Sequence, residues 1–162
     1  MKTKYTKSLF LPVIALLLLL CTALTAQSQS EQVTIGTGTS SSRTTGSPFY
    51  DYSINSTTAA IYTSTEIGQS GCITQIEYYC QTRSDFSGEV HIYMATLNKT
   101  TFTGDNDWPT TYTEVYSNNN ASIAGGTGWR SITLATPYYY DQSAGSLVVI
   151  VTKAVGTQRS QN

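Results

Sequence analysis

Charged residues, histidine and cysteine are all scarce in this sequence. Charged residues make up 12% of 162, and there are one histidine and three cysteines. A structural zinc site takes about four ligands, whereas the chain beyond its apolar N-terminus offers only His91, Cys72 and Cys80. The sequence also has no "GxSxG", no "HExxH" and no glycine-rich phosphate loop. These absences favour a protein that is not an enzyme and carries no cofactor.

Signals for helices are equally sparse. Between Gln27 and Leu134 only Leu97 and Leu134 are leucines, and no apolar stripe repeats with helical spacing. The chain from Gln27 onward is rich in Thr and Ser and holds 11 of the 12 tyrosines. Thr, Tyr, Val and Ile suit a half-buried pleated surface. The composition therefore predicts an all-β protein.

The one long apolar run lies at the N-terminus. It extends from Leu9 to Leu20 and contains Pro12, so it is short of the roughly 20 residues that a membrane span needs. The basic residues that precede it are Lys2, Lys4 and Lys7. This pattern predicts a signal peptide over residues 1–26, cleaved after Ala26. Acylation at Cys21, as in a lipoprotein, is the alternative. Either way we expect a secreted or otherwise extracytoplasmic protein, in the periplasm, at the cell surface or outside the cell.

Cleavage would leave residues 27–162, enough for a single domain with a core of its own. This part carries six basic and ten acidic residues. An acidic surface repels phosphate backbones, which argues against nucleic acid as a partner. No second apolar run predicts a membrane span in the mature chain.

Short strands separated by Gly, Asn and Pro are predicted along the whole mature chain. They cover residues 31–38, 48–54, 59–68, 72–82, 89–96, 112–118, 129–136 and 147–151. The turns between them include "NSTT", "NNN", "ASIAGGTG" and "PYYYDQSAG". About eight or nine such strands are typical of a two-layer antiparallel β-sandwich, jelly-roll-like in architecture.

Two of these strands have informative patterns. In "EVHIYMAT", Val90, Ile92 and Met94 share the face expected in the core, and His91 lies on the outward face. The run "LVVIV" is apolar on both faces, which predicts a central strand covered on both sides.

Cys72 and Cys80 flank seven residues that contain no turn former. If the segment is one strand, their Cα atoms lie about 26 Å apart, whereas a disulfide needs roughly 4.4 to 6.8 Å. We therefore expect two unpaired thiols.

Several phrases in order resemble a β-sandwich module of exported Bacteroidetes proteins. They are "TIGTGT", "PFYDYS", "AIYTSTEIG", "GCITQIEY", "VHIYMA", "TTFTGDNDW", "GWRSITLATPYYYD" and "SLVVIV". Such modules often accompany fibronectin type III repeats or adhesin-like domains. The relatives usually continue beyond the "LVVIV" strand, so the resemblance implies a truncated copy that lacks final strands and leaves this strand uncovered at an edge.

Aromatic residues near strand ends are the main candidates for ligand binding, because flat rings stack on sugars or anchor protein interfaces. They are Tyr50, Tyr52, Trp108, Trp129, Tyr138, Tyr139 and Tyr140. Alternation along "PYYYD" requires at least one of its rings to point outward. The alternative is that these rings cap the ends of the core, and Trp108 is expected to anchor its loop.

The loop "GDNDW" offers oxygen ligands in Asp105, Asn106 and Asp107, which suit a structural Ca²⁺. An ordinary turn rich in Asp and Asn explains the same residues.

These observations lead to an exported accessory or adhesive module, without enzymatic activity, that binds carbohydrate or a cell-surface protein. A structural spacer within a larger secreted protein is the main alternative, and a hydrolase that uses a pair of carboxylates is the third.

Overall fold

The computed structural model describes residues 31–36, 48–49, 55–82, 85–104 and 107–154. The chain divides into two compact units, Met1–Val33 and Thr34–Asn162. All helices and strands described below belong to the second unit. The predicted signal peptide, Tyr50 and Tyr52 lie outside the described residues.

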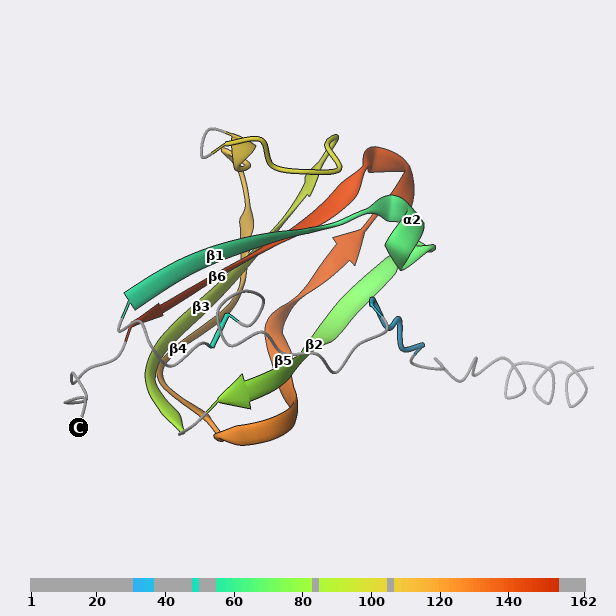
Figure 1. The fold of residues 1–162 in the computed structure, drawn as a ribbon. Coiled ribbons are helices and arrows are strands. Elements are labelled where there is room, and N and C mark those ends of the chain that lie inside the picture. Colours follow the sequence, from blue (N-terminus) through green and yellow to red (C-terminus); the bar gives the residue numbers. More distant parts are fainter. Residues whose placement is uncertain (1–30, 37–47, 50–54, 83–84, 105–106, 155–162) are drawn as a thin grey trace, which may run out of the picture. The chain divides into compact units, whose positions relative to one another are not determined.

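Six strands form two antiparallel sheets (Figure 1). The larger sheet has the order β1-β6-β3-β4, with β1 (Asn55–Tyr62), β6 (Ser146–Ala154), β3 (Phe86–Leu97) and β4 (Thr113–Ile123). The smaller sheet pairs β2 (Gly71–Thr82) with β5 (Gly126–Tyr140). The all-β prediction is confirmed, but the described strands are fewer and longer than the eight or nine short ones expected. No described helix is long and apolar enough to cross a membrane.

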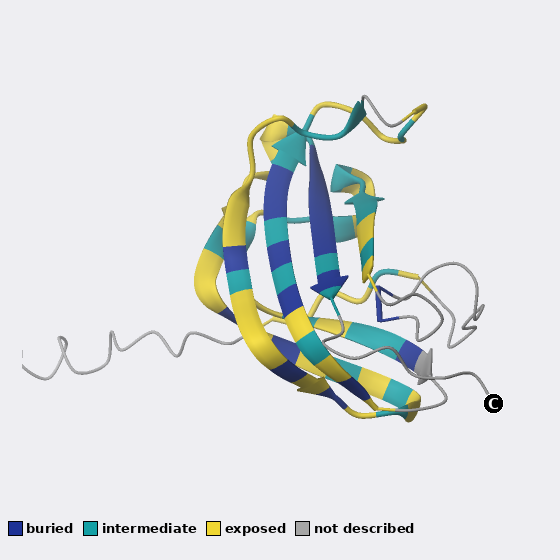
Figure 2. Cartoon of the chain, turned by 90° about the vertical axis from the view of Figure 1, so that its left-hand side faces the viewer, coloured by how far each residue is buried: buried dark blue, intermediate teal, exposed yellow. Residues whose placement is uncertain are grey.

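Strand β6 is the central strand that the "LVVIV" run predicts. It is hydrogen-bonded to β1 on one side and β3 on the other, and every residue from Ser146 to Val151 is buried. Figure 2 shows this buried strand beside strands whose burial varies along their length. Since β6 has a neighbour on each side, the uncovered apolar edge that a truncated copy would leave does not occur here.

The main core takes side chains from both sheets. Val90, Ile92 and Met94 of β3 are fully buried, which confirms their predicted common face, and they belong to the same cluster as Ile132 and Leu134 of β5. Burial of this apolar surface is the principal stabilising contribution to such a fold. The two sheets therefore share one hydrophobic core.

The predicted strand 59–68 ends earlier than expected, because "STEI" forms the short helix α2 (Ser64–Ile67). Thr63 caps it: its Oγ1 accepts from the Glu66 backbone N–H at 3.3 Å, and its own N–H donates to Glu66 Oε2 at 2.8 Å. Glu66 Oε2 also accepts from the Thr63 hydroxyl at 2.8 Å, and the two hydrogen bonds that this carboxylate accepts, from the Thr63 N–H and the Thr63 hydroxyl, lower the pKa of Glu66. Gly68 ends the helix in the left-handed conformation with φ of 76°.

Two predicted turns are strand. "NSTT" is the first half of β1, and "NNN" lies inside β4. Every residue of "NSTT" pairs with β6, whereas "NNN" pairs with β3 at Asn118 and then passes through a bulge before Ala121 pairs with Gly88. Pairing with the neighbouring strand outweighs the weak local preference of Asn for turns. Conversely, residues 31–36, predicted to start a strand, have no regular structure.

Strand β5 is also longer than predicted, because it passes through Pro137 by a bulge. Ile73 of β2 pairs with Tyr138 of β5, and Gln75 pairs with Thr133. The chain therefore advances by two residues on β2 and by five on β5 between these two pairs. A bulge tolerates proline because its residues leave the regular ladder. The bulge lets "PYYY" remain in the strand instead of turning.

After β5 the chain turns through the 3-10 helix η2 (Gln142–Ala144) into Gly145. Gly145 has φ of 131°, and a Cβ there would lie 2.6 Å from the backbone oxygen of Leu97. The Tyr140 hydroxyl donates to the Gly145 carbonyl at 2.6 Å. This turn therefore requires glycine for both conformation and space.

Candidate functional site

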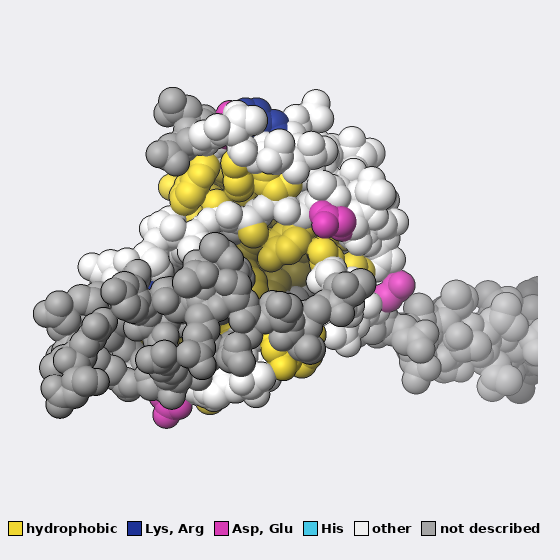
Figure 3. Space-filling model, viewed as in Figure 1, with side chains coloured by type: hydrophobic (Ala, Val, Ile, Leu, Met, Phe, Trp, Pro, Cys, Tyr) yellow, Lys and Arg dark blue, Asp and Glu magenta, His cyan; other side chains and the backbone are white. Residues whose placement is uncertain are grey.

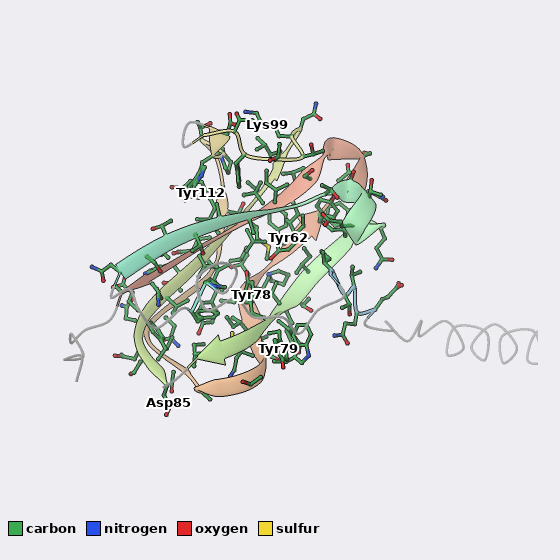
Figure 4. All side chains as sticks on the ribbon, in the orientation of Figure 1. Tyr62, Tyr78, Tyr79, Asp85, Lys99 and Tyr112 are labelled. Atoms are coloured by element: carbon green, nitrogen blue, oxygen red, sulfur yellow. The ribbon has the colours of Figure 1, made fainter. Side chains whose placement is uncertain are left out.

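The outer face of the small sheet is a ladder of four cross-strand pairs. The partners are Cys72 with Tyr139, Gln75 with Thr133, Glu77 with Ser131, and Tyr79 with Trp129. Alternation directs their neighbours Ile76, Tyr78 and Cys80 toward the core. Figure 4 shows Tyr78 and Tyr79 extending from opposite sides of β2. We call these eight residues the ladder face.

The middle of the ladder face is polar and ordered by hydrogen bonds. Glu77 Oε1 accepts from Gln75 Nε2 at 3.0 Å and from Ser131 Oγ at 2.5 Å. Thr133 Oγ1 donates to Gln75 Oε1 at 3.5 Å. All four side chains are exposed. Donors and acceptors are thus held in place while still accessible to a ligand, which lowers the entropy that binding would cost.

Aromatic rings stand at both ends of the ladder face. Trp129 is 51% exposed and meets Tyr79 edge to face, with ring centroids 5.5 Å apart. Tyr139, at the other end, is 67% exposed. The two ends are separated by seven residues of β2, or about 23 Å. Rings at both ends with polar groups between them suit a long, amphipathic ligand that lies along the strands.

The three tyrosines of "PYYYD" divide as alternation predicts. Tyr139 points outward, whereas Tyr140 is buried and Tyr138 packs against the core. The Tyr138 hydroxyl lies 3.1 Å from Thr96 Oγ1, a contact between the two sheets. Of the five aromatic candidates that the structure describes, it therefore brings only Trp129 and Tyr139 to the ladder face.

Trp108 lies elsewhere, over the outer face of the large sheet. It packs with Phe102, at 6.3 Å between ring centroids, against a second apolar cluster that contains Val148 and Ile150 of β6. The segment between β3 and β4 thus covers one end of that face. This confirms the predicted anchoring of the loop by Trp108.

Asp107 stabilises the turn in the same loop. One of its carboxylate oxygens accepts from Lys99, and the other accepts from the Thr103 backbone N–H at 2.7 Å and from Thr103 Oγ1. Together these contacts hold the pKa of Asp107 far below its usual range. Both oxygens that a Ca²⁺ would use are engaged within the protein. The other two predicted ligands, Asp105 and Asn106, lie outside the described residues.

His91 lies on the outer face of the large sheet, as predicted, but it is bound on three sides. Its Nε2 is 2.6 Å from Glu89 Oε1, and its Nδ1 is 2.8 Å from Glu114 Oε1 and 3.1 Å from Ser117 Oγ. Hydrogen bonds to Glu114 and Glu89 raise the pKa of His91. Tyr93 stacks beside the ring at 6.3 Å between centroids. His91 therefore connects β3 to β4 and favours its protonated form.

Cys72 and Cys80 form no disulfide with each other, as their spacing predicts, and they face opposite sides of β2. Cys72 is exposed on the ladder face, and Cys80 is fully buried in the core. Within the described residues, no three His, Cys, Asp or Glu side chains are arranged to bind a metal.

Sequence reasoning missed Tyr79, Gln75, Glu77, Ser131 and Thr133. The alternation in "TQIEYY" and "WRSIT" indicates which residues share a face within each strand. It does not indicate that these two segments, distant in sequence, are paired in this register.

Comparison with known protein families, curated proteins and solved structures finds no match for this chain.

Proposed function

We propose that this protein is an exported, non-enzymatic binding module whose ligand is carbohydrate, held along the ladder face. The observation that carries the proposal is the combination, on one uncovered sheet face, of exposed rings at both ends and an ordered row of hydroxyl, amide and carboxylate groups between them. Sugars present apolar ring faces and equatorial hydroxyls, and this surface offers partners for both.

The shared core of the two sheets supports a two-layer β-sandwich of jelly-roll type as the scaffold. Such a scaffold keeps the ladder face rigid, because the inner side chains of β2 and β5 are packed against the large sheet. The described surface also suits an uncharged partner, since few charged side chains are visible on the face shown in Figure 3. The ladder face itself carries one charged residue, Glu77.

The exposed rings and polar groups of the ladder face are spread along about 23 Å of strand, so the ligand we propose is an internal stretch of a neutral polysaccharide chain. An extended chain can contact both aromatic ends at once. Binding of this kind adds weak contacts over a large area, as in other flat interfaces, and depends most on a few aromatic anchors.

The test is affinity electrophoresis in gels that contain soluble neutral polysaccharides such as xyloglucan, glucomannan or laminarin. We expect at least one to retard the protein, and Trp129→Ala or Tyr139→Ala to weaken that retention about tenfold. Tyr112→Ala is the matched control, because Tyr112 is also 51% exposed but lies just before β4 and packs against Tyr93 of the large sheet. Unretarded migration in every polysaccharide would favour a structural spacer instead. Equal retention of all three variants would place the binding site away from the ladder face.

A further inference from the structure

A hollow on the outer face of the large sheet is separate from the ladder face. It has a volume of about 260 Å³ and is lined by Asn55, Ser56, Thr57, Glu89, His91, Thr152, Lys153 and Ala154. Pockets for drug-sized ligands occupy about 300 to 1,000 Å³. This hollow is therefore of a size for a smaller molecule.

Strand register explains why the hollow exists. Asn55, Ala154 and Glu89 lie in one row across β1, β6 and β3, and Thr57, Thr152 and His91 lie in the next. The walls of each row are separated by two strand spacings, about 10 Å. Because the side chain of Ala154 is small, it leaves the space between the Asn55 and Glu89 side chains unfilled.

The apolar rows of this face are covered by a loop. Further along the same strands, Ala95, Val148 and Ile150 are buried with Phe102 and Trp108 of the loop that follows β3. The covering loop packs on the apolar rows. The polar rows that form the hollow lie outside this cluster, and Asn55, Thr57 and Glu89 are exposed there.

The charged side chains beside the hollow belong to one ion-pair network. Glu89 and Glu114 are both bound to His91, whose raised pKa favours the cation. The ammonium of Lys153 lies on the core side of β6 instead, 5.5 Å from the centre of the buried Phe86 ring. Hydroxyl and amide groups supply the remaining polar atoms of the walls. A neutral ligand with several hydroxyls would satisfy these groups without leaving a charge unpaired.

His91 also holds the Glu89 side chain in position. Its Nε2 is hydrogen-bonded to one oxygen of the Glu89 carboxylate, Oε1. A carboxylate has about four lone-pair sites, so Oε2 retains acceptor capacity for a ligand hydroxyl. The Glu89 side chain is 49% exposed and therefore accessible.

We propose that this hollow is a second binding site, which takes one neutral sugar ring such as the terminal residue of a glycan. The Glu89 carboxylate accepts from ring hydroxyls, Asn55 and Thr57 bind from the opposite wall, and Ala154 and Thr152 form the floor. This site is independent of the ladder face and would bind a chain end where the ladder face binds an internal stretch.

The test is a titration of the ¹⁵N-labelled protein, followed by two-dimensional NMR, with D-galactose, D-mannose, L-fucose and D-glucose up to about 20 mM, the range suited to weak sites. We expect at least one sugar to shift the amides of residues 55–57, 89–91 and 152–154. Ala154→Leu, which fills the floor, and Glu89→Gln, which keeps the shape, should each raise Kd about tenfold or more. D-glucuronate should leave the same amides unshifted, because Glu89 repels it.

Trp129→Ala serves as the control from the ladder face and should leave the monosaccharide shifts intact. Failure of all four sugars to shift these amides, shifts that survive Ala154→Leu, or equal binding of glucuronate would each overturn the proposal. Loss of polysaccharide retention in Trp129→Ala concerns only the ladder face, so the two sites fail or succeed separately.

Discussion

Replacement of Ile92 by alanine should test whether the two sheets are held together by one core. Ile92 is fully buried on β3, in register with Val151 of β6, and belongs to the same cluster as Ile132 of the other sheet. Removing three carbons forfeits about 0.8 kcal/mol per methylene in transfer free energy, or roughly 2.4 kcal/mol. The cavity left behind brings the expected loss to about 3 to 4 kcal/mol.

The assay is urea unfolding followed by circular dichroism. With a slope of about 2 kcal/mol/M, the midpoint of Ile92→Ala should fall by about 1.5 to 2 M. Ile92→Val should cost only about 1 kcal/mol, and Ser87→Ala, at an exposed position of the same strand, should stay within about 0.5 kcal/mol of the parent. The double variant with Ile132→Ala should be non-additive, because residues in one cluster share a cavity. A loss below 1 kcal/mol for Ile92→Ala, or strict additivity with Ile132→Ala, would refute the shared core.

Three further predictions concern single positions. Gly145→Ala should lower Tm strongly, because a positive φ alone costs about 1 to 3 kcal/mol and the added Cβ would clash with the backbone. Gly71→Ala is the control, since a Cβ there meets nothing within 4 Å. Equal Tm values for the two variants would contradict the backbone strain expected at Gly145. The raised pKa of His91 means that its stabilisation is complete below about pH 6.5 and is lost as pH rises through the folded-state pKa. His91→Gln should therefore flatten the pH dependence of unfolding by about 0.5 kcal/mol, and an unchanged slope would contradict the network. In the native protein, Ellman's reagent should modify Cys72 rapidly and Cys80 only after unfolding; fast reaction of both thiols would contradict the burial of Cys80.

The parts of the fold that the sequence predicts well are those in which burial decides the pattern. The alternation around Ile92 and the apolar run of β6 each have one arrangement that keeps apolar side chains away from water. The separation of Cys72 from Cys80 follows from strand geometry alone. These features depend on neighbours along the chain, so a single sequence is sufficient to predict them.

Other features depend on partners distant in sequence. The polar segment at Asn55 becomes strand because β6 offers backbone hydrogen bonds, and the bulge at 119–120 lies between two residues that pair with β3. The ladder face likewise needs the register of Tyr79 against Trp129, which the turn signals do not specify. The helix α2 was predictable: "TSTEIG" contains both a capping box and a C-terminal glycine.

The most direct measurement of the central claim uses the fluorescence of Trp129. The chain has two tryptophans, so Trp108→Phe leaves Trp129 as the single reporter, 51% exposed on the ladder face. On titration with the polysaccharide that retards the protein, its emission should shift to shorter wavelength and its quenching by iodide should fall, because a stacked sugar excludes water from the indole. An unchanged spectrum at polysaccharide concentrations that saturate binding would place the ligand elsewhere and contradict the ladder face as the binding site.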